Sequence, residues 1–379
     1  TYTIRVKVVD KAGNPRTMTD TSFVFDSGEP LAGVADPADG NYKNTVTMIK
    51  GTAQDVAPGV IAGVEIAIST GTGGSERYWN WQNQVWQATE DSTATVARNG
   101  DDSDDGTGFN QTTELWKKTT GLPTWSTLAD KSVRVYVWAV DSAGNEAVHI
   151  DTHINFTVDQ AVVLSSAVYP VSNQALSYIA VTSGTISDPG ALPSGVASVV
   201  VAIEKESNHT YWDALGDQFD PTQNVVWNPA VYGAIQGTWS FTAINMDRFD
   251  TDRWYRVKER GVDVAGNAPN LDHTEMHTND KSARFLIDKT APVSKSTAPA
   301  LAGGATVYYN SQQGIIWGTA TDAPSGQNFP SGLRQVSVRL SRLNSLHTRE
   351  WYNWDLSWTG NNSFDVAYAG APLSTWRKD

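Results

Sequence analysis

The chain of 379 residues contains no cysteine. Disulfide bonds, thiolate zinc sites and thiol nucleophiles are therefore all excluded. The sequence also lacks a sustained apolar stripe with a 3.6-residue period, so we expect little α-helix. It has no Gly-x-Ser-x-Gly elbow, P-loop or dinucleotide fingerprint, and no carboxylate pair recurs in an apolar setting that would tune it for acid–base catalysis. The sequence predicts that the protein is not an enzyme.

Basic residues are in the minority, with 28 Lys and Arg against 41 Asp and Glu and a formal net charge of −13. Binding to nucleic acid needs a basic stripe that displaces counterions from phosphates, so nucleic acid is not expected as a partner. An acidic surface keeps crowded copies apart and attracts divalent cations. No long apolar run is present, and we expect no direct membrane insertion by this segment.

The strongest positive feature is a set of three repeated phrases. Asp-x-Ala-Gly-Asn occurs at Asp10–Asn14, Asp141–Asn145 and Asp263–Asn267. A closing Phe-x-x-Asp step follows each copy, at Phe23–Asp26, Phe156–Asp159 and Phe285–Asp288. Gly-Thr-x-x-Asp recurs at Gly51–Asp55, Gly184–Asp188 and Gly318–Asp322. A period of about 130 residues is too long for one turn of a solenoid, so each repeat is expected to be a domain with its own core.

The repeat predicts four parts along the chain. Residues 1–30 are expected to be the C-terminal strands of a preceding unit, 31–160 and 161–289 two whole units, and 290–379 a unit that lacks its last strands. An incomplete sandwich would leave a sheet edge open, so we expect strands equivalent to 1–30, from a neighbouring copy or from further sequence, to complete the last unit.

Apolar residues alternate with polar ones before each Asp-x-Ala-Gly-Asn phrase, as at Val133, Val135 and Val137. Such alternation is typical of antiparallel strands with one buried face. In the third copy, Glu259 and Gly261 occupy positions where the pattern requires apolar residues, which predicts a bulge or register shift. Short strands separated by Gly, Pro, Asn and Asp indicate two-sheet sandwiches.

An aromatic element also recurs in each unit. Its members are Tyr78, Trp79, Trp81 and Trp86 in the first, Tyr211, Trp212 and Trp227 in the second, and Trp351, Tyr352, Trp354 and Trp358 in the third. A further Trp follows in each unit, at Trp125, Trp239 and Trp376. Recurrence favours a core role, because a sandwich needs a large buried side chain whether or not it binds anything. In the alternative, exposed faces of Trp79, Trp81, Trp212, Trp351 and Trp354 stack on sugar rings.

The alternating strand that leads into Asp-x-Ala-Gly-Asn, the closing Phe-x-Val-Asp and the step Ile287–Pro292 together resemble tandem bacterial immunoglobulin-like domains. The resemblance implies an all-β fold of tandem immunoglobulin-like β-sandwich domains in an extended array. It also implies an extracellular place at the cell surface, in an S-layer subunit or an adhesin stalk, with a structural role and other copies of itself as partners. The alternative function is that of an adhesin or carbohydrate-binding module that recognises cell-surface glycan.

The steps between units are the candidate metal sites. Asp26, Glu29, Asp159 and Asp288 could pool oxygen ligands from adjacent units, with Asp322 near Asp288, and Ca²⁺ is the one cofactor expected. We interpret Asp10, Asp141 and Asp263 as turn formers, since one carboxylate with one Asn supplies too few oxygens for the six to eight that Ca²⁺ takes.

Overall fold

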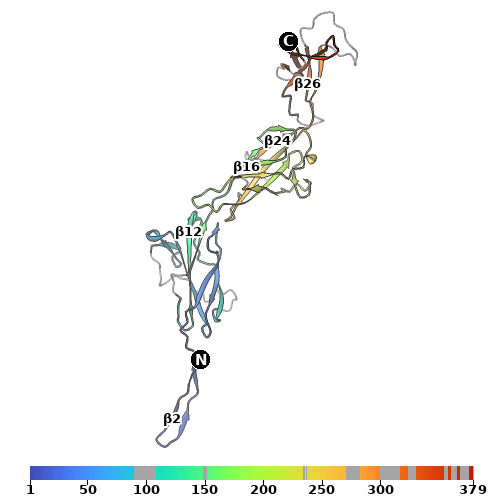
Figure 1. The fold of residues 1–379 in the computed structure, drawn as a ribbon. Helices are drawn as coiled ribbons and strands as arrows, with labels where there is room; N and C mark the ends of the chain where they lie inside the picture. The colour runs from blue at the N-terminus through green and yellow to red at the C-terminus, as the bar shows by residue number, and fades with distance from the viewer. Residues whose placement is uncertain are drawn as a thin grey trace. The chain divides into compact units, whose positions relative to one another are not determined.

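The computed structural model describes residues 1–88, 108–147, 152–233, 235, 237–269, 282–298, 316–322, 330–353, 357–359, 365–367 and 375–378, with side chains up to residue 351 (Figure 1). Within these ranges the regular structure is β-strand apart from three short 3-10 helices, η1 (Gly73–Ser75), η2 (Trp125–Leu128) and η3 (Met246–Arg248). The prediction of an all-β fold is confirmed. Two compact units make up the chain, the first from residues 1–164, 186–198 and 261–270 and the second from residues 165–185, 199–260 and 271–379.

Residues 1–23 form a long antiparallel hairpin (Figure 1). In it β1 (Tyr2–Ile4) pairs with β4 (Thr21–Phe23), and β2 (Lys7–Val9) pairs with β3 (Pro15–Thr17). The rings of Tyr2 and Phe23 stack with their centroids 5.2 Å apart. Every side chain of the hairpin is exposed, including the apolar ones that the alternating sequence pattern assigns to a buried face.

Residues 31–158 fold into two sheets. The larger contains, in spatial order, β10 (Val85–Gln87), β9 (Arg77–Asn80), β8 (Ile61–Thr70), β12 (Lys131–Asp141), β13 (His153–Val158) and β6 (Asn41–Lys43). The smaller contains β11 (Thr113–Lys118), β7 (Ile49–Gln54) and β5 (Leu31–Asp36). All pairs are antiparallel except β6 with β13. With β5, β7 and β11 as strands A, B and E, and β8, β12 and β13 as C, F and G, the order is immunoglobulin-like.

The core of this sandwich comes from the alternating residues. Val133, Val135 and Val137 of β12 are buried and pack in one cluster with apolar residues of both sheets. Trp79 of β9 joins the same cluster, and its indole N–H donates to the carbonyl oxygen of Gly121 at 2.8 Å. The aromatic element therefore supplies core in this sandwich, as its recurrence indicated.

The next pair of sheets repeats the arrangement. One sheet contains β14 (Leu164–Tyr169), β16 (Thr182–Ser187), β22 (Thr238–Phe241) and β21 (Val231–Tyr232). The other contains β15 (Gln174–Leu176), β24 (Ala283–Ile287), β23 (Arg253–Asp263), β17 (Val196–Lys205), β18 (Thr210–Asp213) and β19 (Gln218–Asp220), with β20 (Asn228–Pro229) paired to β17. Again an edge strand pairs in parallel, here β15 with β24. The boundaries between repeats that the sequence predicts, after residues 30, 160 and 289, stay predictions.

Strand β23 does not break where the sequence pattern does. It runs uninterrupted from Arg253 to Asp263, and Glu259 and Gly261 are both buried, with Lys258 also buried and Arg260 and Val262 partly exposed. A Cβ on Gly261 would lie 2.5 Å from Cδ1 of Ile186 and 2.6 Å from Cγ1 of Val163. Because these side chains fill the space, the inward position carries glycine, and the bulge or register shift stays a prediction.

The remaining described strands form smaller sheets. These are β25 (Val293–Ala298), β26 (Ile316–Thr321) and β32 (Thr375–Lys378) in one, β27 (Val336–Val338) and β31 (Asp365–Ala367) in another, and β28 (Ser341–Leu343), β29 (Arg349–Asn353) and β30 (Ser357–Thr359) in a third. Gly318 of β26 stands opposite Trp376 of β32 in the register.

The same register pairs Gly51 with Trp116 and Gly184 with Trp239. The assignment of the further Trp is corrected accordingly: Trp116, and not Trp125, is the counterpart of Trp239 and Trp376. Trp125 lies instead in η2, where its indole N–H donates to the carbonyl of Val46 at 2.6 Å.

Candidate metal centres

The Asp-x-Ala-Gly-Asn phrase forms one turn in all three copies. In the copy at Asp141, Oδ1 accepts from the backbone N–H groups of Ala143 and Asn145, at 2.9 and 2.8 Å. Oδ2 accepts from the side-chain amide of Asn145 at 2.7 Å. Gly144 has a φ of 89°, which only glycine adopts without strain. The turns at Asp10 and Asp263 have the same bonds from Asn14 and Asn267.

One aspartate from each of the three phrases meets the others in a first cluster, Asp26, Asp55 and Asp141. Each offers a carboxylate oxygen, and these oxygens all lie within 4.8 Å of one another. Asp26 follows β4, Asp55 directly follows β7, and Asp141 ends β12. The turn thus both closes a hairpin and presents Asp141 to the other two.

Two oxygens of the first cluster are buried without a hydrogen-bond partner. Asp55 is only 5% exposed, and its Oδ2 accepts no hydrogen bond, although Oδ1 accepts from the N–H of Val56 at 2.7 Å. Asp26 likewise uses Oδ1, for the N–H of Gly28 at 3.0 Å, and leaves Oδ2 without a partner. Unpaired buried carboxylate oxygens are costly and call for a compensating charge.

Burial, hydrogen bonds and repulsion between carboxylates shift the pKa values in the first cluster. Burial raises the pKa of Asp55, the hydrogen bond from Val56 opposes that rise, and repulsion from Asp26 and Asp141 adds to it. Burial also acts to raise the pKa of Asp141, but hydrogen bonds, led by those from Asn145, outweigh it and leave the pKa lowered. Two like charges 4.8 Å apart repel by about 3 kcal/mol at an effective dielectric constant of 20.

A second cluster has the same origin in the phrases. Asp159 directly follows β13, Asp188 directly follows β16, and Asp263 ends β23. Their carboxylate oxygens also lie within 4.8 Å of one another, and Asp159 and Asp263 are buried. Burial raises the pKa of Asp188, with repulsion from Asp159 and Asp263 acting in the same direction and the hydrogen bond from Gly195 acting against it.

In the second and third copies, the Asn of the turn also holds the segment that carries a closing aspartate. The side-chain amide of Asn267 donates to the carbonyl oxygen of Asp159 at 2.8 Å, and that of Asn145 to the carbonyl oxygen of Asp26 at 3.4 Å. Among the described residues, no Lys, Arg or His forms an ion pair with any of the six clustered carboxylates. Each cluster therefore holds three acidic groups with no basic side chain to neutralise them.

Asp288 and Asp322 form a similar pair, contributed by a Phe-x-x-Asp step and a Gly-Thr-x-x-Asp phrase. Asp288 directly follows β24 and Asp322 directly follows β26. Ser331 links them, since its N–H donates to Asp288 Oδ2 at 2.8 Å and its hydroxyl to Asp322 Oδ2 at 3.2 Å. Burial acts to raise the pKa of Asp288, but its hydrogen bonds, led by those from Ser331, leave that pKa lowered.

These donor sets fit a hard divalent cation. Carboxylate oxygens are the ligands that Ca²⁺ and Mg²⁺ prefer, and three carboxylates can supply up to about six of the six to eight oxygens that Ca²⁺ takes. The buried oxygens without partners in the first cluster, Oδ2 of Asp26 and of Asp55, are the donors that such an ion would use. The absence of cysteine leaves oxygen as the main ligand type.

The structure places the four residues predicted from the sequence differently. Asp26 and Asp159 each lie in a cluster, and Asp288 lies with Asp322. Glu29 is exposed and belongs to neither three-residue cluster. Sequence reasoning missed Asp55 and Asp188, and it assigned Asp141 and Asp263 to turns alone. All four residues could have been identified from the sequence, because each of the three repeated phrases contains an aspartate in every copy.

Most of the tryptophans that could stack on sugar rings are buried or have a ring face covered by another side chain. Trp79 is 8% exposed and Trp212 is 1% exposed, so neither offers a ring face to a sugar. Trp81 is partly buried against the core, and the guanidinium of Arg339 lies 4.0 Å from the ring centroid of Trp351. Trp354 lies outside the described residues.

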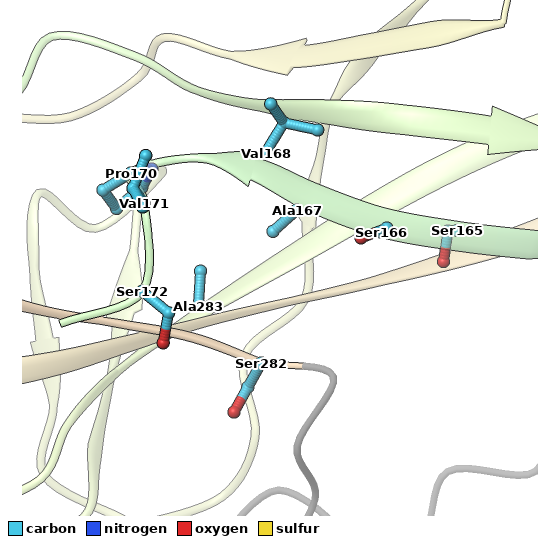
Figure 2. A pocket seen from close by; sticks show the side chains of 9 residues that line it. All are labelled: Ser165, Ser166, Ala167, Val168, Pro170, Val171, Ser172, Ser282 and Ala283. Carbon is cyan, nitrogen blue, oxygen red and sulfur yellow. The ribbon is translucent and has the colours of Figure 1, made fainter. Parts of the chain in front are cut away.

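A surface hollow in the second unit carries no such chemistry (Figure 2). It is lined by the small and apolar side chains of β14 and the turn after it, with Ser282 and Ala283 at the start of β24. None of its lining residues is titratable. In the part of the chain that the structure describes, no helix is long and apolar enough to cross a membrane.

Residues 1–27 match a family model described as a bacterial Ig-like domain. The matched stretch is the hairpin with the first Asp-x-Ala-Gly-Asn turn and the first closing aspartate. The strand order of residues 31–158 agrees with that description. The two sandwiches are tandem repeats of an Ig-like fold. No curated protein matches the chain.

Several solved structures resemble the chain in part. The fibronectin(III)-like modules of Clostridium thermocellum CbhA have 13% identity and a TM-score of 0.32, over 68% of this chain and 94% of theirs. The FN1–FN3 domains of chicken CNTN1 have 11% identity and a TM-score of 0.31, over 76% of this chain and 75% of theirs. A structure of a 1.5-MDa bacterial ice-binding adhesin has 13% identity and a TM-score of 0.32, over 93% of this chain and 96% of its own. Scores this low assign no function to the chain.

Proposed function

We propose that this chain is a structural, non-catalytic segment of a bacterial cell-surface protein, and that each aspartate cluster holds a divalent cation, calcium in the first place. In the proposal, the ion ties the segment that enters a sandwich to the sandwich itself. The finer role is that of a scaffold in an S-layer or a surface stalk, with other copies of the protein as partners.

One observation carries the proposal. Three phrases that are far apart in the sequence each deliver one aspartate to the same place, and they do so twice, in the first and second clusters. A turn needs only the aspartate of Asp-x-Ala-Gly-Asn, so turn formation does not explain why the other two phrases keep theirs. A shared ligand explains all three positions at once.

In the proposal, the aspartates bind the cation and the asparagines position them. The closing aspartate, Asp26 or Asp159, brings the incoming segment to the site, and Asp55 or Asp188 presents an oxygen from the sandwich. Asn145 and Asn267 position their turns by holding both the turn aspartate and the incoming backbone. A bound cation would supply positive charge to three carboxylates that have no basic partner among the described residues.

The repeat supports a mechanical role. A cation that binds the folded form and not the unfolded chain stabilises by mass action, and ligands from distant segments are lost together when the chain unfolds. A surface protein built from such repeats would be more stable and more rigid where calcium is abundant, and less stable and more flexible where calcium is scarce.

The test compares the chain in calcium chloride with the chain in excess chelator. We expect calcium to raise the melting temperature and to slow hydrogen exchange in residues 24–30, the segment that carries Asp26. The same melting temperature and the same exchange in both buffers would overturn the proposal.

A further inference from the structure

We propose that the two clusters are not equivalent: the first binds a cation tightly, and the second binds one more weakly, because the loop after Asp188 donates hydrogen bonds to two of its carboxylates. The inference rests on the proposed function, because it takes cation binding by such clusters as given and names which one responds. It assigns the difference to one short loop.

The loop of the first cluster donates to Oδ1 of Asp55 through the N–H of Val56 but gives no hydrogen bond to Oδ2 of Asp26 or of Asp55. After Asp55, the N–H of Gly59 donates to the carbonyl oxygen of Val56 at 2.8 Å, so the loop closes on itself. Gly59 nevertheless lies against the site. A Cβ at this position would be 2.1 Å from Oδ2 of Asp55 and 2.6 Å from Oδ2 of Asp26. The two buried oxygens without partners therefore converge on the same point.

The loop of the second cluster turns its donors toward the carboxylates. The N–H of Ser194 donates to Oδ2 of Asp159 at 2.7 Å, and the N–H of Gly195 donates to Oδ2 of Asp188 at 2.7 Å. The hydroxyl of Ser194 also lies 3.4 Å from Oδ2 of Asp188 and accepts from the N–H of Ala265 at 3.2 Å. One oxygen, Oδ1 of Asp188, is left without a partner.

The Asp288–Asp322 pair shows that this arrangement is a repeated device. The N–H of Ser331 donates to Asp288, and the N–H of Gly332 donates to Oδ2 of Asp322 at 2.7 Å. Gly332 and Gly195 have φ values of 86° and 87°, a conformation that favours glycine. A Ser-Gly pair after proline thus serves both sites, as Pro193-Ser194-Gly195 and Pro330-Ser331-Gly332.

The first loop has a different sequence at the same place. It reads Pro58-Gly59-Val60, so glycine replaces the serine and valine replaces the left-handed glycine. The stretch from Asp55 to Pro58 is also shorter than the stretch from Asp188 to Pro193. The short loop cannot reach over the carboxylates as the longer one does, which explains why the oxygens of the first cluster remain unpaired.

Donor groups and a cation compete for the same lone pairs. In the second cluster a cation must displace or share the N–H groups of Ser194 and Gly195, whereas in the first it meets two free oxygens. Ligand charge and preorganisation set calcium affinity over several orders of magnitude. We therefore expect the first cluster to bind calcium at least about tenfold more tightly than the second.

Isothermal titration of the whole chain with calcium chloride tests this assignment. We expect one tight site, which D55N removes and D188N leaves in place. Glu29→Gln is the matched control, because it removes an exposed carboxylate three residues from Asp26 without touching the cluster. Two tight sites of equal affinity, or loss of the tight site in D188N and not in D55N, would overturn the inference while the proposed function stands.

Loop exchange gives an independent measure. Replacing residues 56–60 by residues 189–195 should remove the tight site, and the reverse exchange should create a second one. Melting in chelator confirms that each variant folds. If neither exchange changes the number of tight sites, the loop is not the determinant. If the unaltered chain binds no calcium even at millimolar concentration, the proposed function falls as well.

Discussion

Gly51 and Trp116 face each other across β7 and β11 so closely that a Cβ on the glycine would lie 2.6 Å from Cζ2 of the indole and 1.8 Å from the carbonyl oxygen of Gly33. Gly184 and Trp239 repeat this contact, with the same 2.6 Å to Cζ2. The glycine of Gly-Thr-x-x-Asp is therefore a packing residue, and the aspartate four positions later belongs to the candidate metal centre.

The first prediction concerns this contact. Because the neighbouring atoms are backbone and a buried ring, Gly51→Ala should destabilise the protein by about 1–3 kcal/mol or more. Gly63→Ala in the adjacent sheet is the control, since a Cβ there meets nothing within 4 Å. Urea denaturation of both variants measures the difference, and equal stabilities would show that the strands separate at no cost.

A second prediction concerns the core. Trp212 is 1% exposed, and its indole N–H donates to the carbonyl oxygen of Ala243 at 2.8 Å. Trp212→Ala should cost about 3–5 kcal/mol of stability. Leu215→Ala, at a position that is 99% exposed in the turn after β18, should change stability by less than about 0.5 kcal/mol. A small effect at Trp212 would return the aromatic element to a binding role.

A third prediction tests the Asn that holds each turn. Asn267→Ala leaves Asp263 Oδ2 and the carbonyl of Asp159 without their shared donor in a buried place, which should cost about 1–3 kcal/mol. Asn14→Ala removes the same turn contact to Asp10 in an exposed hairpin, so its effect should be clearly smaller. Equal effects in thermal unfolding would mean that Asn267 acts only within its turn.

The fourth prediction is a change of sign. In metal-free protein, Asp55→Asn removes a buried charge that its neighbours repel, so the variant should melt at a higher temperature than the parent. In millimolar calcium the same variant lacks a ligand and should melt lower. Calorimetry in the two buffers gives both values. A variant that is less stable in both buffers would show that the carboxylate stabilises the fold without a cation.

The pH dependence of the metal-free protein follows from the same groups. The pKa values of Asp55 and Asp188 are raised in the folded state, so the folded protein takes up protons more readily than the unfolded chain. Acidification from neutral pH through these raised values should therefore increase stability. Further acidification should reduce it, because the lowered pKa of Asp141 gives a stabilisation that is present above the unfolded value and lost below the folded one. The double variant D55N/D188N should lack the initial increase.

Sequence reasoning could predict the sandwich because the signal is local. Alternation in β12 and the glycine of each Asp-x-Ala-Gly-Asn turn depend on near neighbours, and the structure has both. The clusters are not local. Nothing within the Gly-Thr-x-x-Asp phrase shows that Asp55 approaches Asp26 and Asp141, because the approach is set by the order of strands in two sheets. Glu29 looked equivalent to Asp26 in sequence, yet it is exposed outside the cluster.

The tryptophans divide in the same way. The recurrence of Trp79 and Trp212 indicated a core position, and both are buried. The pairing of Trp116 with Gly51 could not be predicted, because the number of residues between the glycine and its Trp differs between the repeats. Only the register across the sheet is the same. The glycine at the inward position 261 could not be explained from the sequence, since the side chains of Val163 and Ile186 that fill its space come from distant segments.

The most direct measurement is a crystal structure of the chain grown in calcium chloride, with a matching crystal in manganese for anomalous scattering. We predict an ion in the first cluster with Oδ2 of Asp26 and Oδ2 of Asp55 among its ligands, at about 2.3–2.6 Å for calcium. An empty first cluster in both crystals, with the carboxylates turned apart or paired to a basic side chain, would contradict the proposal.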